Sequence, residues 1–427
     1  MRFLRLGGLA AIALSVLIGA SQFRLYPTED VLTIWVRGTP EQTAIYRQII
    51  DEFRTLNPEA KLRVEVMPAR RFVQKLLAGI DAGHAPDVFN LHWRDMPQVS
   101  STGQLLPLDE LVNRHGIDRD DYYPVGLRAY TYRGVLYGLP VKGSTISCYY
   151  NMDLFDRYGV DYPTDDWTWE ELVEKAQKLT VDEDGDGMTD IYGLTPYDIA
   201  NYVWSAGGDF LRQEDGRWVS NLDDPKVLLG TQFYVDLYFE NKVSPPRPGM
   251  RSDNPMSTFT FEAGRVAMAI TGPWRIPDYQ LLDRFRWNLA LVPEGPGGRQ
   301  TRYAGSGFSI WKDTPQPEAA WKLIEFLVGP ESMAKMAVLG SDLPPQRSVA
   351  RTAFLREDTP WDEEVFVRAM DYEVQIFPQE VWWEDLFRRM QDELDAALAG
   401  RETVEESLRQ AHEVTNAYLD RIYREAP

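Results

Sequence analysis

Residues 31–91 alternate between two periodicities. An apolar run at 31–36 predicts a buried strand, an alternating pattern at 62–66 predicts a second strand, and residues 87–91 predict a third. Between them, apolar residues recur every three or four positions, which is the spacing of one helix face, and Pro40 stands where a first helical turn accepts it. The order strand, helix, strand, helix, strand predicts an α/β fold with a largely parallel sheet.

The loops that follow these strands contain the first candidate binding residues. Ligands of open α/β sheets collect at the carboxyl ends of the strands. The loops after the first and third strands hold Arg37, Gly38, Thr39, His92, Trp93, Arg94 and Asp95, and all of these except Arg37 and His92 are taken as candidate ligand contacts.

Helix and strand signals continue along the rest of the chain. A further strand is predicted at 145–150. Thr168 and Glu171 have the spacing of a capping box, in which each side chain accepts a hydrogen bond from the other residue's backbone N–H at the start of a helix. Residues 383–398 carry one apolar face and predict a helix that ends at Gly400.

Three consecutive segments are specific as an ordered series, namely SCYYNMDLFDRYGV, PTDDWTWEELVEKAQKLT and DEDGDGMTDIYG. Weaker motifs occur at fitting places elsewhere: APDV at 85–88, GLPV at 138–141, FEAGRVAM at 261–268, TGPW at 271–274 and AGRETVEESL at 399–408. Together they resemble the extracellular solute-binding proteins of ABC transporters, the family that includes the maltodextrin- and glycerol-3-phosphate-binding proteins.

The resemblance implies an α/β, two-lobe periplasmic binding protein fold of type II. Each lobe would be a mostly parallel sheet flanked by helices, with the ligand cleft between the lobes. The implied N-lobe comprises 31–142 and 296–328, and the implied C-lobe 147–292 and 331–427. Crossings are expected near 142–145, 293–298 and 328–330, and the Gly/Pro-rich run at 293–298 supports the second one independently.

The implied ligand is a sugar or oligosaccharide. Such a ligand has apolar faces and a rim of hydroxyls, so its site needs aromatic rings and planar polar groups. A buried hydroxyl without a partner costs about 1–3 kcal/mol, which discriminates between epimers. The resemblance assigns ligand contacts to Ser144, Tyr197, Trp274, Gly305, Ser306, Trp382 and Trp383.

Several of these residues have alternative explanations. Trp274 could pack in the core, Gly305 could serve a tight turn, and the pair Arg94 and Asp95 could face solvent. Arg94 and Asp95 align in reversed order with a charged pair of the maltodextrin binders. Ser144 stands where those proteins have a glutamate, so a different sugar is predicted.

An acidic loop offers a candidate metal site. Its aspartates have the spacing of the front of a calcium loop, although Gly193 stands where an EF-hand carries a bidentate acid. Structural calcium is one interpretation and a solvated aspartate turn is the other, and no cofactor is required by either. The candidate ligands are Asp182, Asp184, Asp186 and Asp190.

Composition and the N-terminal segment bear on partners and location. A net charge of −20 argues against nucleic acid and anionic lipid as partners. Residues 1–27 are expected to be a secretory signal or an N-terminal anchor, because basic residues precede an apolar run that ends in small residues. The sole cysteine, Cys148, lies inside a predicted strand, so neither a lipoprotein anchor nor an intrachain disulfide is expected. We expect a periplasmic or extracytoplasmic location.

We therefore expect the substrate-binding component of an ABC importer, a monomer that captures a carbohydrate by hinge closure and presents it to permease subunits. The sequence contains no nucleophile elbow, no phosphate loop and no metal-binding spacing of histidines, so we do not expect an enzyme. Three alternatives stay open. They are a glycerol-3-phosphate or glycerophosphodiester binder that uses Arg94, Arg275 or another cation of the cleft, a secreted carbohydrate-active hydrolase or lyase, and a sensor subunit that acts on a receptor kinase.

Overall fold

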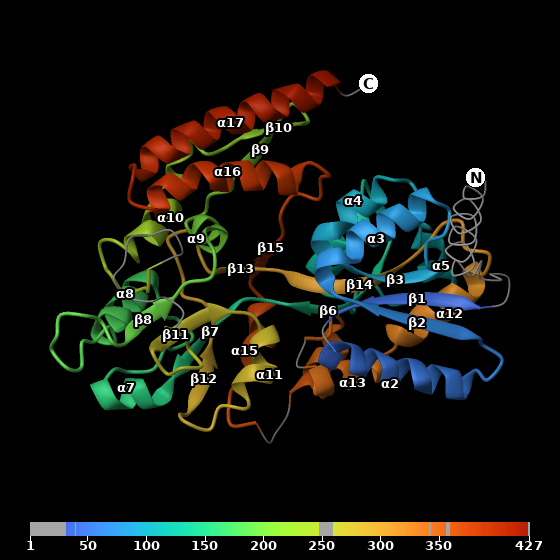
Figure 1. The fold of residues 1–427 in the computed structure, drawn as a ribbon, viewed down its shortest axis with the longest axis horizontal. Coiled ribbons are helices and arrows are strands. Elements are labelled where there is room, and N and C mark those ends of the chain that lie inside the picture. The colour runs from blue at the N-terminus through green and yellow to red at the C-terminus, as the bar shows by residue number, and fades with distance from the viewer. Residues whose placement is uncertain (1–30, 39, 247–258, 341–342, 356–358, 426–427) are drawn as a thin grey trace, which may run out of the picture.

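The structure is a computed structural model that describes residues 31–38, 40–246, 259–340, 343–355 and 359–425. Two lobes lie side by side in Figure 1. The expected signal or anchor at 1–27 lies outside the described residues, and so does Thr39. Within the described part, no helix combines the length and the apolar character needed to cross a membrane.

The first lobe is built on a five-stranded sheet, and the predicted strand–helix–strand–helix–strand unit is confirmed there. Its strands are, in spatial order, β2 (Leu62–Met67), β1 (Leu32–Arg37), β3 (Val88–His92), β14 (Ala304–Ile310) and β6 (Leu139–Ser144). Its other elements are α2 (Pro40–Leu56), α3 (Ala69–Asp81), the 3₁₀ turn η1 (Trp93–Asp95), α4 (Met96–Ser100), α5 (Asp109–Arg114), α6 (Pro124–Ala129), the hairpin β4 (Thr131–Tyr132) and β5 (Val135–Leu136), α12 (Pro317–Leu327), α13 (Pro330–Gly340), α14 (Arg347–Val349) and the π-helix η4 (Ala350–Phe354).

The second lobe is built on a four-stranded sheet. Its strands are, in spatial order, β12 (Trp287–Ala290), β7 (Ser147–Asn151), β11 (Val266–Thr271) and β8 (Tyr192–Thr195). Its helices are α7 (Met152–Tyr158), α8 (Trp169–Lys178), α9 (Ile199–Ser205), α10 (Pro225–Asp236), the 3₁₀ turn η3 (Pro273–Arg275), α11 (Ile276–Tyr279) and α15 (Glu364–Ala369).

The sheets are mixed, so the expectation of mostly parallel sheets is wrong in this detail. Strands β1, β2 and β3 are parallel, but β14 pairs antiparallel with β3 and β6. In the second sheet only β8 and β11 are parallel. Parallel pairing requires a crossover within one sheet. Strands β7 and β14 instead enter from the other lobe, so no crossover helix sets their direction.

The chain passes between the lobes at their shared border. It leaves the first sheet after Ser144 and enters the second at Ser147, and it returns between Ala290 and Ala304. On the way back, β13 (Gln300–Arg302) pairs in parallel with β15 (Glu373–Gln375), which gives the border two neighbouring strands.

Helix α13 packs on α2 of the first lobe, and the Gly143 N–H donates to the Leu343 carbonyl oxygen. Residues 331–340 therefore lie beside a helix of the first lobe. The expected lobe limits stay predictions.

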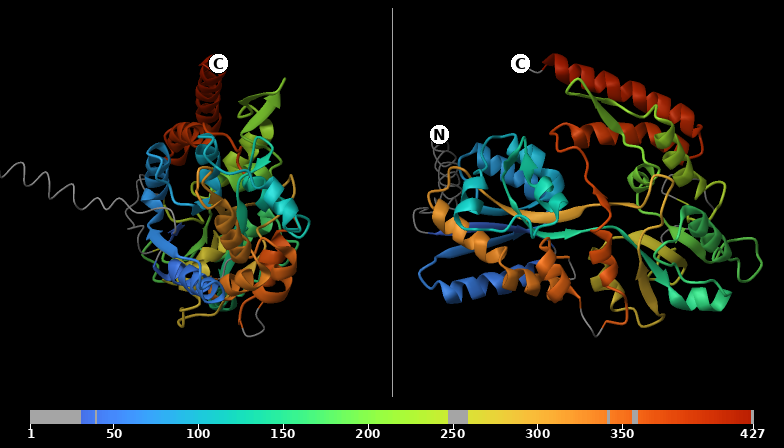
Figure 2. Two further views of the ribbon diagram at one scale, coloured as in Figure 1. Left: turned by 90° about the vertical axis from the view of Figure 1, so that its right-hand side faces the viewer. Right: turned by 180° about the vertical axis from the view of Figure 1, so that it is seen from behind.

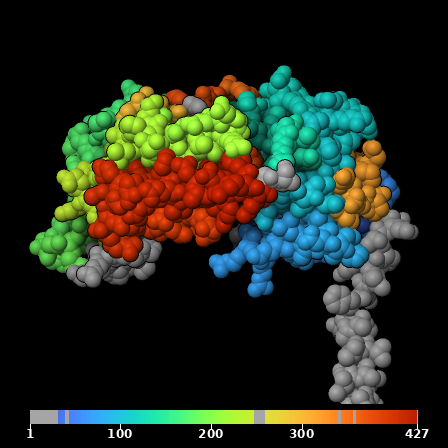
Figure 3. Space-filling view, turned by 90° about the horizontal axis from the view of Figure 1, so that it is seen from above, coloured from blue at the N-terminus to red at the C-terminus, as the bar shows by residue number. Residues whose placement is uncertain are grey.

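A C-terminal layer covers the second lobe and reaches toward the first (Figures 1 and 2). It contains α16 (Trp383–Leu398), α17 (Val404–Glu425) and the hairpin of β9 (Leu211–Glu214) and β10 (Arg217–Ser220). Figure 3 shows the hairpin beside the C-terminal helices. The backbone N–H of Trp218 donates to the hydroxyl of Tyr423 at 2.6 Å, so the hairpin is tied to α17.

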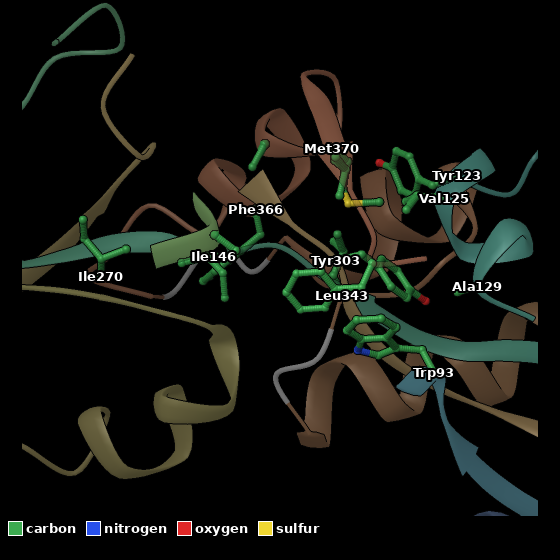
Figure 4. Packing of buried hydrophobic residues seen from close by; sticks show 14 of the residues in the cluster. Trp93, Tyr123, Val125, Ala129, Ile146, Ile270, Tyr303, Leu343, Phe366 and Met370 are labelled. Atoms are coloured by element: carbon green, nitrogen blue, oxygen red, sulfur yellow. The ribbon is translucent and has the colours of Figure 1, made fainter. Parts of the chain in front are cut away.

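One continuous core joins the two lobes. Figure 4 shows its buried side chains running from Ile270 of the second lobe through Ile146 to Tyr303 and Trp93 of the first. Because the apolar contact continues across the border, the lobes are held together by packing as well as by the connecting strands.

The capping box of α8 is confirmed, and we expect Thr168→Ala to lower the free energy of unfolding by about 1 kcal/mol. The Glu171 N–H donates to Thr168 Oγ1 at 3.4 Å, and the Thr168 N–H donates to Glu171 Oε2 at 3.0 Å. Denaturant unfolding would measure the loss. Thr164→Ala removes an exposed hydroxyl outside the cap and is the matched control; equal effects of the two changes would contradict the prediction.

Candidate functional site

A cavity of about 1070 Å³ lies between the lobes. The first lobe contributes strand ends of its sheet, and the second contributes the loops after β8 and β11 together with α16. Six predicted residues of the first lobe line it, namely Gly38, Trp93, Arg94, Ser144, Gly305 and Ser306. Tyr197 and Trp274 line it from the second lobe. The structure thus brings together residues up to 268 positions apart in the chain, and their contact with a ligand stays a prediction.

Three predicted ligand contacts, Asp95, Trp382 and Trp383, are not among the residues that line the cavity. Asp95 lies behind the wall and accepts a hydrogen bond from Arg37 at 3.0 Å. Trp382 is half-buried outside the cavity. Trp383 is 3% exposed and packs on Phe377 and Phe387, so it belongs to the core of the C-terminal layer.

Helix α16 offers a different face to the cavity from the one expected. Its lining residues are Glu384, Asp385, Phe387, Arg388 and Gln391. Their spacing of three and four marks one helix face, next to the face on which Trp383 is buried. The aromatic contribution of this helix is therefore Phe387.

Two aromatic rings form the second-lobe wall. Trp274 is half-buried in η3, directly after β11, and its ring centroid lies 5.9 Å from that of Tyr197. The Trp274 ring covers Gly272 so closely that a Cβ at residue 272 would lie 2.1 Å from it. The glycine in TGPW therefore provides the space that the indole ring occupies. A rigid, partly exposed aromatic surface suits the apolar face of a ligand.

Arg302 supports this wall from β13. It forms an ion pair with Asp198, and its Nη2 donates to the Tyr197 hydroxyl at 2.6 Å. Its guanidinium also lies over the Tyr197 ring, 4.7 Å from the centroid. Since Asp198 in turn caps α9, one buried arginine holds Tyr197 in place and links it to the border between the lobes.

The adjacent residues Arg94 and Asp95 have different roles. Arg94 Nη1 lies 3.7 Å from Glu384 Oε2, an ion pair that joins the first lobe to α16. Burial lowers the pKa of Arg94, and burial raises the pKa of Asp95 to about 6 in spite of the nearby Arg37. The loss of water around these groups strengthens their electrostatic interactions with whatever enters the cavity.

The structure changes the interpretation of two predicted ligand contacts, Gly305 and Trp93. Gly305 lies in strand β14, not in a turn, and a Cβ there would lie 2.4 Å from the Tyr303 hydroxyl and 2.6 Å from the Lys142 carbonyl oxygen. Its lack of a side chain therefore reflects close packing beneath the wall. Trp93 is 1% exposed and packs on Phe377 and Tyr303, so it forms the base of the wall rather than a free aromatic surface.

The acidic loop brings three of its four predicted ligands together. Carboxylate oxygens of Asp182, Asp184 and Asp190 all lie within 4.8 Å of one another, and Asp186 is not part of this group. The carboxylates already accept hydrogen bonds from the loop's backbone, including Gly185 and Gly187 donating to Asp182 at 2.8 Å. This geometry agrees with a solvated aspartate turn and with a calcium loop, so calcium stays a prediction.

Arg275, a candidate phosphate ligand, lies outside the wall. It forms ion pairs with Glu262 and Asp278. Arg94 is therefore the member of that pair of candidates that reaches the cavity.

Sequence reasoning did not single out several residues that line the cavity. Arg37 and His92 are the last residues of β1 and β3, and their position at the carboxyl ends of these strands could have identified them. Lys142 lies two residues before Ser144 in β6, so the two-residue period of a strand places it on the same face. Asp198 and Arg302 carry no local signal, because their pairing spans 104 residues.

Comparison with known proteins agrees with this architecture. The Arabinooligosaccharide-binding protein of Bacillus subtilis is 25% identical over 329 residues, which are 74% of this chain and 73% of that protein. The sugar-binding protein MalE from the phytopathogen Xanthomonas citri has the same fold, with a TM-score of 0.79 and 24% identity over 93% of this chain and 100% of that chain. The ABC substrate-binding protein Lmo0181 from Listeria monocytogenes, in complex with cycloalternan, also has this fold. Its TM-score is 0.78, with 24% identity over 91% of this chain and 99% of that chain.

These likenesses confirm the two-lobe fold class. The family model for bacterial extracellular solute-binding proteins matches residues 38–334, which is most of the chain. This protein therefore belongs to the bacterial extracellular solute-binding protein family.

Proposed function

We propose that this protein is the substrate-binding component of an ABC importer and captures a sugar or oligosaccharide between its lobes. The observation that carries the proposal is the interlobe cavity, which combines half-buried aromatic rings with charged and hydroxyl groups. Its volume of about 1070 Å³ lies slightly above the usual range of small-molecule sites, roughly 300–1,000 Å³, so more than one sugar ring has room. Relatives named for oligosaccharide and maltodextrin binding support this ligand class.

Hinge closure provides the mechanism. Trp274 and Tyr197 belong to one lobe and Ser144 and Ser306 to the other, so a ligand that touches both walls binds better when the lobes approach each other. The ligand then shifts the equilibrium between open and closed forms by its difference in affinity for the two. The closed form is the species that a permease recognises, and membership of an extracellular solute-binding family supports an event outside the cytoplasm. Export through the N-terminal segment and a monomeric state belong to the same proposal.

The first experiment is thermal unfolding of the chain from about Thr28 onward against monosaccharides, oligosaccharides, polyols and glycerol phosphates, each with and without calcium. A ligand at a hundredfold excess over its dissociation constant adds about 2.7 kcal/mol to the free energy of unfolding. We expect a clear shift with one sugar class and no product in the recovered ligand. Product formation would instead identify a carbohydrate-active enzyme, and the absence of a shift with every sugar would overturn the proposal.

A further inference from the structure

The wall of the interlobe cavity reverses the charge balance of the protein. The chain has 65 acidic and 45 basic residues, apart from its histidines. The wall instead has three acidic side chains and five basic ones, which are Arg37, Arg94, Lys142, Arg302 and Arg388. A neutral sugar needs hydrogen-bond donors and acceptors but no excess of positive charge, so this enrichment indicates something more about the ligand.

Four of these cations also shape the wall. Each arginine is ion-paired with a carboxylate of the protein, and the partners are Asp95, Glu384, Asp198 and Asp385. These pairs engage part of each guanidinium group. The arginines add further N–H donors to the wall of the cavity.

Three side chains form a row across that sheet. Ser306 of β14 pairs in register with His92 of β3 on one side and with Lys142 of β6 on the other. Directly paired residues on neighbouring strands point to the same face, and all three line the cavity. This row of His92, Ser306 and Lys142 is called the donor row below.

Each member of the donor row can donate a hydrogen bond. His92 Nδ1 accepts from the Arg94 N–H at 3.4 Å, so in the neutral imidazole Nε2 carries the proton. The Ser306 side chain belongs to a residue that is 5% exposed, and its hydroxyl has no partner among the described residues. Lys142 supplies an ammonium group. A buried hydroxyl without a partner at the surface of a cavity is a group that a ligand would satisfy.

The electrostatic environment of His92 shows the sign of the field at the row. Burial lowers the pKa of His92 well below its usual value, and the nearby charges of Arg37, Arg94, Lys142 and Arg302 lower it further. The charged neighbours with the largest effects on this ring are all cations. The cations that add to the effect of burial on His92 would also stabilise an anion placed beside it.

We propose that the ligand is an anionic sugar whose carboxylate or phosphate group binds to the donor row. The sugar ring then lies toward Trp274 and Tyr197 on the opposite lobe. This inference rests on the proposed function, since it names the class of sugar that the same cleft takes.

Matched ligands test the proposal. Calorimetric titration compares sugars that differ only at C6, such as glucose, glucuronate and glucose 6-phosphate, with the galacto and manno series and short oligomers of the best sugar. We expect the carboxylate or the phosphate form to bind at least about 10-fold tighter than the neutral form, since a charge-assisted hydrogen bond is worth about that factor or more. The preferred anion identifies whether a uronate or a sugar phosphate is the ligand.

Variants locate the effect. Lys142→Gln should weaken binding of the anionic sugar about 10- to 100-fold and should change binding of its neutral counterpart by less than about 3-fold. Lys312→Gln removes the same charge at an exposed position outside the cavity and is the matched control. Ser306→Ala provides a second, nearly isosteric test of the row if Lys142→Gln does not fold, and it should also weaken the anionic sugar selectively.

The outcomes separate this inference from the proposed function. Equal affinity for neutral and anionic sugars, or equal weakening of both by Lys142→Gln and Ser306→Ala, would overturn the inference and leave sugar capture intact. No binding of any sugar would overturn both.

Discussion

Trp274→Ala is expected to weaken sugar binding by roughly 30-fold or more while the protein stays folded. Removing an aromatic anchor from the centre of a binding surface costs about 2 kcal/mol or more, which corresponds to that factor. Trp274 is half-buried and contacts Tyr197 at the wall. Its loss should therefore lower the free energy of unfolding by only about 1 kcal/mol, the average effect of a substitution. Calorimetry with the best ligand and denaturant unfolding measure the two effects.

Two further variants make this result specific. Gly272→Ala keeps the indole but places a methyl group where the ring lies, so it should displace Trp274 and weaken binding as well. Trp361→Ala removes another half-buried tryptophan, which stacks on Trp287 away from the cavity, and should leave affinity unchanged. Unchanged affinity of Trp274→Ala, or a collapsed protein, would place Trp274 in the core instead.

The features that the sequence predicts well are those whose signals lie within one short segment of the chain. Helix α16 was expected at 383–398 and has those bounds, because its apolar face and terminal glycine lie within the segment. The capping box of α8 has the same local character. Strand ends also give candidate ligand contacts, since parallel strands bring their carboxyl ends to one edge.

Side-chain partners were less predictable, because they come from distant segments. Asp95 and Arg94 are adjacent, yet one pairs with Arg37 and the other with Glu384, which lies 290 residues away. Contacts with distant segments also decide which side of α16 faces the cavity. The sequence pattern gives α16 one apolar face but not the way in which the helix docks, and the docking decides that Phe387 lines the cavity and Trp383 does not.

The prediction of strand direction was wrong in part for a related reason. A pattern of alternating strands and helices favours parallel pairing, but β14 enters its sheet from the other lobe. The packing of α13 on α2 is likewise not indicated by the sequence of either helix alone. Both features are decided by tertiary contacts that no single segment contains.

Phe377 is the residue at which these tertiary contacts converge. It is 1% exposed and follows β15 at the border between the lobes. Its ring centroid lies 6.0 Å from Trp93 of the first lobe and 5.1 Å from Trp204 of the second. It also packs at 4.8 Å on Phe387 of α16, so one side chain contacts both lobes and the C-terminal layer.

Phe377→Ala is therefore expected to lower the free energy of unfolding by about 3–5 kcal/mol, the usual cost of truncating a buried phenylalanine. That loss is a large part of the roughly 5–15 kcal/mol that stabilises a typical protein. Denaturant unfolding followed by tryptophan fluorescence and by circular dichroism would measure it, and two separated transitions would show that the lobes have lost their coupling.

Phe377→Leu provides the matched control, since it keeps most of the buried volume and should cost less than about 1.5 kcal/mol. An Ala variant as stable as the Leu variant would mean that the ring is not packed between the lobes. Phe377 lies directly behind Trp93 and Phe387, two residues that line the cavity. The void left by the Ala change should therefore also weaken sugar binding, whereas a lesion confined to one lobe would lower stability and leave affinity unchanged.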